Sequence, residues 1–210
     1  MVKNVEHHRQ ISKDRVRKIR KPKNKIIIAV EGKNKTEKIY FNNFDDGKKS
    51  YSISFAKGNY TDPVNLVKML IEEVKHLDLD LKDGDKAYCV FDTDVNPNKN
   101  EAIKEAKSLA SSYHIEIITS TPSIELWFLL HYEYTTSEMD NINVLNRLKK
   151  YYASYDKNIN IYPDIKNDIL KATQRAKKLE KYQLDNGKII GTTHANPSTE
   201  VYKIVTELLK

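Results

Sequence analysis

Long apolar runs are missing from this chain. None exceeds five residues, whereas a membrane-spanning helix needs about 20. The basic segment at the start has no apolar centre, so we expect no secretory signal peptide. Cysteine is also scarce, because Cys89 is the only one and cannot form an internal disulfide. These absences favour a cytoplasmic protein that is not held in a membrane.

Positive charge is concentrated near the N-terminus. The formal net charge is +7, and residues 1–24 hold nine Lys and Arg against two acidic residues, so the rest of the chain is nearly neutral. Such a basic arm favours contact with nucleic-acid phosphates, although a solvated, flexible arm has the same composition. The candidate phosphate-binding residues are Arg15, Arg17, Lys18, Arg20, Lys21, Lys33 and Lys35.

Apolar runs alternate with amphipathic segments over residues 25–121. This order predicts an α/β fold with a parallel sheet flanked by helices, followed by a helical C-terminal part over residues 122–210. Thr36, Asp62 and Asn196 are expected to cap the starts of three helices. The predicted strands are 26–30, 51–56, 87–91 and 115–118, and the later helices include 144–152, 163–182 and 197–209.

Acidic residues stand where two of the predicted strands end. Glu31 follows the first strand, and Asp92 and Asp94 follow the third. The carboxyl ends of parallel strands meet at the ligand-binding edge of a sheet, so we expect these three carboxylates to converge. If the chain stays extended, Asp92 and Asp94 point to the same side. Their mutual repulsion favours a bound hard cation, Mg²⁺ or Mn²⁺.

Three further residues are second-rank candidates for the same edge. Glu125 and His131 lie in the apolar segment 123–132, where ionisable side chains are unusual; they are either satisfied core residues or part of a metal or proton-transfer site. His194 precedes the predicted cap of the last helix and either accompanies that cap or faces the site.

The sequence resembles two known groups of proteins. Val30-Glu31-Gly32 with Thr36-Glu37 and Phe91-Asp92-Thr93-Asp94 is similar to the Toprim domain of topoisomerases, primases and overcoming-lysogenization-defect nucleases. The whole chain resembles the RloB family of bacterial proteins from restriction and phage-defence loci. The segments that carry this second resemblance are 30–41, 91–94, 122–132 and 196–199.

The resemblances imply a Toprim-like catalytic core over residues 25–121. In that core Glu31 is the single acid, Asp92 and Asp94 bind metal, and the activity is Mg²⁺- or Mn²⁺-dependent cleavage of nucleic acid in antiviral defence. An activating partner or ligand is compatible with that role.

Three other interpretations remain open. Asp92 resembles the nucleophile of haloacid-dehalogenase phosphatases, with Asp94 as general acid and Ser120 as the second motif. A non-enzymatic module would bind nucleic acid or nucleotides without cleaving them. The acids would also be explained if they only capped neighbouring helices.

Overall fold

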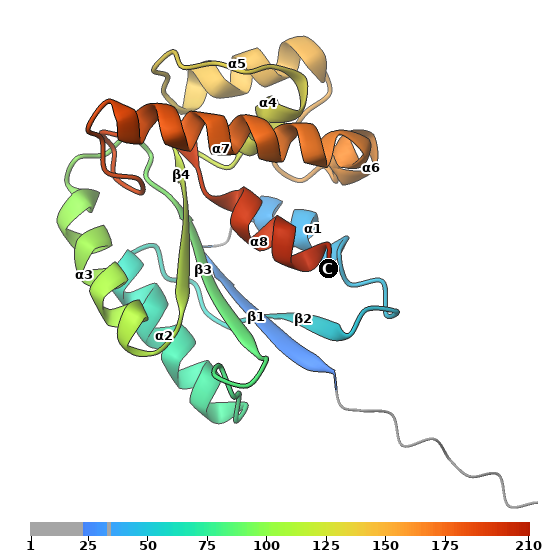
Figure 1. Cartoon of the computed structure of the whole chain (residues 1–210), viewed down its shortest axis with the longest axis vertical. Helices are drawn as coiled ribbons and strands as arrows, with labels where there is room; N and C mark the ends of the chain where they lie inside the picture. The colour runs from blue at the N-terminus through green and yellow to red at the C-terminus, as the bar shows by residue number, and fades with distance from the viewer. Residues whose placement is uncertain (1–22, 33–34) are drawn as a thin grey trace, which may run out of the picture.

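The computed structural model describes residues 23–32 and 35–210 (Figure 1). Of the candidate phosphate-binding residues, Lys35 lies in these ranges and is exposed. The others, Arg15, Arg17, Lys18, Arg20, Lys21 and Lys33, lie outside the described residues.

Five strands form one sheet in the order β2-β1-β3-β4-β5. The first four strands are parallel, and β5 pairs with β4 in the antiparallel direction. The predicted α/β fold is therefore confirmed, with a short edge strand that the sequence did not indicate. The strands are β1 (Asn24–Val30), β2 (Tyr51–Phe55), β3 (Lys86–Asp92), β4 (Glu116–Thr121) and β5 (Ser198–Thr199).

Alternate residues of the central strands pack against different helical layers. In β1, Ile27 and Ala29 belong to a cluster with α2 (Pro63–His76) and α3 (Lys99–Ser112). Ile26, Ile28 and Val30 belong to a larger cluster with α1 (Thr36–Asn42) and α8 (Val201–Leu208). Figure 1 shows these helices on the two faces of the sheet. Burial on both faces explains the continuous apolar runs of the strands.

The other helices lie across the end of the sheet where β4 finishes (Figure 1). They share the larger hydrophobic cluster with the sheet, so the acidic strand ends lie beneath a helical layer. In the described ranges no helix is long and apolar enough to cross a membrane. The helices are α4 (Glu125–Tyr132), α5 (Asn141–Tyr151), α6 (Tyr162–Ile165), a 3₁₀ turn (Lys166–Asp168) and α7 (Ile169–Asp185).

Of the predicted helix caps, only Asp62 is confirmed, as its side chain accepts a hydrogen bond from the Asn65 amide. Thr36 does not cap α1, because its hydroxyl donates to the Lys157 carbonyl. Asn196 is not a cap either, since its side chain bonds the backbone of Met139 in both directions. The last helix starts only at Val201, because residues 198–199 pair with β4.

The predicted helix 163–182 is also interrupted. It begins as the four-residue α6, passes through the 3₁₀ turn at 166–168 and continues as α7 to Asp185.

Candidate functional site: an acidic cluster at the strand ends

Carboxylates from different elements gather at the carboxyl edge of the sheet. Glu31 follows β1, Asp92 ends β3, Glu37 lies in the first turn of α1, and Glu125 begins α4. With Asp94 just beyond β3 they form a set that we call the acidic cluster. Sequence reasoning placed four of these five residues in the site and named Glu37 only within a resemblance motif.

The pKa of Asp92 shows the effect of these neighbouring carboxylates most clearly. Burial is the main cause that raises its pKa well above the usual aspartate value, and the negative charges of Glu37, Glu125, Asp94 and Glu31 raise it further. An aspartate in such surroundings holds its proton more tightly unless a cation compensates the repulsion.

Glu37 is the most deeply buried member of the cluster, with 1% of its surface exposed. Burial raises its pKa to about 7, with help from Glu125 and Glu31 and against the weaker effect of Lys157. One of its carboxyl oxygens, Oε2, has no hydrogen-bond partner among the residues that the structure describes. Glu37 therefore exchanges its proton close to neutral pH, and one of its oxygens is available as a ligand atom.

Lys99, at the start of α3, is the cation within the cluster. Its ammonium lies 2.6 Å from Asp94 Oδ2 and 3.1 Å from Glu31 Oε1, and it also donates to the Asp92 carbonyl at 3.2 Å. Burial lowers the pKa of Lys99, but Asp94 and Glu31 outweigh that effect and the net shift is upward. Lys99 is thus charged and neutralises the outer part of the cluster.

The two aspartates of the Asp-x-Asp motif do not share one extended strand. Strand β3 ends at Asp92, and Asp94 has a left-handed backbone with φ +52. Besides contacting Lys99, Asp94 accepts a hydrogen bond from the side-chain amide of Asn141 at 2.9 Å. The condition under which both aspartates would point to the same side, an extended chain through Asp94, is not met, because the chain turns there towards α3.

Glu125 is fixed by two hydroxyl donors. Ser123 donates to Oε2 at 2.5 Å and Tyr155 to Oε1 at 3.1 Å. The same helix is anchored to α1 by the hydrogen bond from the Trp127 indole to the Tyr40 hydroxyl at 2.8 Å. Glu125 is 3% exposed and faces the cluster, as its effect on the pKa of Asp92 shows.

The two candidate histidines lie elsewhere. His131 donates from Nδ1 to the Trp127 carbonyl at 2.9 Å, and burial lowers its pKa to about 4. The charged groups that influence the pKa of His131 are Asp168 and Arg175, and neither belongs to the acidic cluster. His194 is exposed and lines a cavity beside α3.

The arrangement and the chemistry of the side chains in the acidic cluster both concern metal binding. Across residues 23–32 and 35–210 no three His, Cys, Asp or Glu side chains are arranged to hold one ion. The chemistry of the cluster nevertheless fits a hard cation, because all its donors are oxygens. Two buried oxygens beside it, Glu37 Oε2 and Asn141 Oδ1, have no partner. Lys99 lies between Glu31 and Asp94, where it supplies the compensating charge.

Local sequence gave little signal for the supporting residues. Lys99 follows Asp94 by five positions, a spacing that becomes meaningful only because the chain turns at Asp94. Asn141 and Tyr155 reach the cluster from segments far along the chain. Glu37 is the exception, since its place in the first turn of the helix after β1 can be read from the nearby sequence.

The fold and the site define an α/β protein with a buried acidic cluster at the carboxyl edge of a mostly parallel sheet. A model of the family described as RloB-like protein matches residues 26–208. The chain therefore belongs to the RloB-like family. No match emerges from comparison with curated proteins or with solved structures.

Proposed function

We propose that this protein is a Toprim-type nuclease that uses Mg²⁺ or Mn²⁺ to cleave phosphodiester bonds of nucleic acid, in antiviral defence. The observation that carries the proposal is the acidic cluster, in which five carboxyl groups from strand ends and helix starts gather and, among the described residues, only the Lys99 ammonium contacts them. A divalent cation at this edge would supply charge neutralisation for substitution at phosphorus.

Each side chain of the acidic cluster has its own role in the proposed cleavage. Glu31 and Asp92 would hold the metal, with Asp94 completing the set. The carboxylates would have to rearrange for this, because no three of them surround one position in the described residues while Lys99 contacts Glu31 and Asp94. The pKa of Glu37 near 7 suits it to take or give a proton at Oε2 close to neutral pH. Ser123 and Tyr155 orient Glu125 and so keep one carboxylate in place. The basic N-terminal arm would contact flanking phosphates.

Lys99→Gln tests the idea that Lys99 competes with the metal. In the absence of metal, the free energy of unfolding of the variant should be about 1–2 kcal/mol lower than that of the wild type, because Glu31 and Asp94 lose their partly buried counter-ion. Its affinity for Mn²⁺ should rise by roughly tenfold, because a bound cation no longer displaces an ammonium. Urea unfolding in chelator and Mn²⁺ titration calorimetry measure the two effects.

Lys68→Gln is the matched control for this test, since Lys68 is an exposed lysine of α2. It should leave both quantities unchanged. Unaltered or weaker Mn²⁺ binding by Lys99→Gln would contradict the competition between lysine and metal.

The phosphatase alternative finds less support. Ser120 would be its second motif, yet the Ser120 side chain is buried and shares a hydrogen bond of 2.9 Å with the Thr199 hydroxyl on β5. That hydroxyl is engaged at the sheet edge, and Glu31 and Glu37 have no role in such a reaction.

A substrate panel separates the three functions. Purified protein is incubated with Mn²⁺ and labelled single- and double-stranded DNA and RNA, tRNA, and a chromogenic phosphomonoester. We expect cleavage of a nucleic acid that chelator stops. Hydrolysis of the phosphomonoester alone would identify a phosphatase, and binding of nucleic acid without cleavage by any metal would favour the non-enzymatic module.

A further inference from the structure

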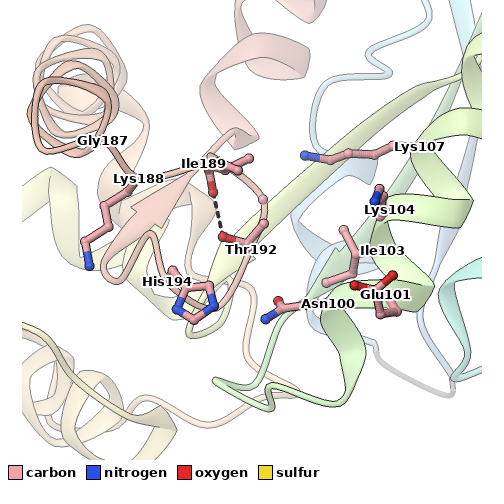
Figure 2. A pocket seen from close by; sticks show the side chains of 11 residues that line it. Asn100, Glu101, Ile103, Lys104, Lys107, Gly187, Lys188, Ile189, Thr192 and His194 are labelled. Atoms are coloured by element: carbon pink, nitrogen blue, oxygen red, sulfur yellow. Dashed lines mark hydrogen bonds between the residues drawn. The ribbon is translucent and has the colours of Figure 1, made fainter.

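A second candidate site lies beside the acidic cluster, in a cavity of about 680 Å³ between α3 and the loop 187–194. Figure 2 shows the side chains of α3 on one wall and those of the loop on the other. We call this cavity the α3 pocket. A volume of this size falls in the range of small-molecule and cofactor sites.

The α3 pocket is rich in uncompensated positive charge. Lys104 and Lys107 line it from α3 and Lys188 from the loop, together with the exposed His194. None of these lysines forms an ion pair within the described residues. The acid that lines the pocket is Glu101. This balance favours an anionic ligand.

Lys107 is the central cation of the pocket. Its ammonium is partly buried and donates to the Ile190 carbonyl at 2.7 Å, which leaves two N–H groups for a ligand. The acid that raises its pKa, Glu200, is already engaged by Lys203 at 2.6 Å and by Thr119. Burial of a lysine without a carboxylate partner costs free energy that a bound anion would recover.

The loop is shaped around this lysine. Gly191 has φ +76, and a Cβ at that position would overlap the Lys107 ammonium and lie 3.0 Å from the Thr119 hydroxyl. The loop is also tied to α3 by Asn100, whose side chain donates to the Thr193 hydroxyl at 3.0 Å and accepts from its amide at 3.1 Å. These contacts hold the two walls of the pocket at a fixed spacing.

The pocket also offers one exposed apolar side chain. Ile189 on the loop is 70% exposed, whereas Ile103 on the α3 wall belongs to the core. An inorganic phosphate would leave Ile189 uncovered. A ligand with both a phosphate and a flat, weakly polar ring system would cover it and reach the lysines.

From these features we infer that the α3 pocket binds a nucleotide, with its phosphate at Lys107 and Lys104 and its base against the exposed Ile189. The ligand is either a free nucleotide or one nucleotide unit of a bound nucleic-acid strand, since the chemistry of recognition is the same. Asn100 of the pocket directly follows Lys99, which contacts the acidic cluster, so the two sites are neighbours along the chain.

The test is a binding measurement in chelator, where cleavage plays no part. The full chain is titrated by calorimetry with ATP, GTP, a nucleoside monophosphate and inorganic phosphate, and by fluorescence anisotropy with labelled single-stranded oligonucleotides. We expect saturable binding of a nucleotide or an oligonucleotide that Lys107→Gln weakens by at least about tenfold. Lys104→Gln, at an exposed position, should weaken it several-fold without affecting folding.

Lys181→Gln serves as the control, because Lys181 is exposed on α7 and does not line the pocket. Binding of free nucleotides would identify an effector site, and binding of oligonucleotides alone would identify a substrate subsite. Both support the inference if Lys107→Gln and Lys104→Gln reduce them and Lys181→Gln does not. No binding of any probe, or equal binding by the three variants, would overturn it.

The outcome is independent of the proposed nuclease activity. Asp92→Asn should bind the nucleotide as the wild type does, because Asp92 is not among the residues that line the pocket. Failure of the metal site would therefore leave this binding intact, and failure of nucleotide binding would leave the metal site untouched.

Discussion

Replacement of Asp92 by Asn is expected to abolish the rise in melting temperature that Mn²⁺ gives the wild-type protein. Asp92 lies among four other carboxyl groups, so its charge is the one that a bound cation stabilises most. Metal at about 100 times its Kd adds roughly 2.7 kcal/mol to the free energy of unfolding. For a chain of this size that corresponds to a shift of roughly 5–10 °C.

In chelator the same variant should melt above the wild type, because the neutral amide removes repulsion within the cluster. Asp83→Asn is the matched control, since Asp83 is exposed in the loop before β3. It should keep the full metal-dependent shift. An equal Mn²⁺ shift in Asp92→Asn and wild type would remove Asp92 from the metal site.

Glu37→Gln is expected to reduce the pH dependence of stability in the metal-free protein, in which the raised pKa of Asp92 contributes as well. The pKa of Glu37 rises from 4.5 to about 7 on folding. Between these values the unfolded chain has released the proton while the folded chain still holds it, so the free energy of unfolding falls as the pH rises through this window. The loss amounts to about 3 kcal/mol by pH 8.

Urea unfolding at pH 5 and pH 8 in chelator measures this difference. The wild type should lose more stability between the two pH values than Glu37→Gln, by about that amount. Glu116→Gln, at an exposed position of β4, should behave as the wild type. An equal pH dependence in Glu37→Gln and wild type would show that Glu37 is not the buried proton holder.

Much of the fold follows from local sequence. The runs 26–30 and 87–91 are continuously apolar because both faces of β1 and β3 are buried. The Asp62-Pro63 pair marks the start of α2 without help from distant residues. Parallel strands then bring Glu31 and Asp92 to one edge. These features depend on short-range patterning, which a single sequence records.

The parts that sequence reasoning missed depend on contacts between distant segments. Asn196 looks like a helix cap, yet its side chain is bound by Met139, 57 residues away in the chain. Thr36 likewise gives its hydroxyl to Lys157. Tyr155 reaches Glu125, and Lys99 meets Glu31, only after the fold has brought them together. No local pattern encodes such partners.

The predicted role of the basic arm stays a prediction, because residues 15–21 and Lys33 lie outside the described residues. Metal binding by the acidic cluster also stays a prediction. The acidic cluster has oxygen donors and two buried oxygens without partners, and Lys99 now contacts two of its carboxylates.

The most direct test of the proposed function is the rate at which Asp92→Asn cleaves nucleic acid in Mn²⁺, measured beside wild type and Asp83→Asn on the substrate that the panel identifies. We predict that wild type and Asp83→Asn cleave at similar rates, that chelator stops both, and that Asp92→Asn is at least about 100-fold slower. Cleavage by Asp92→Asn at the wild-type rate, or cleavage that persists in chelator, would contradict a metal-dependent nuclease centred on the acidic cluster.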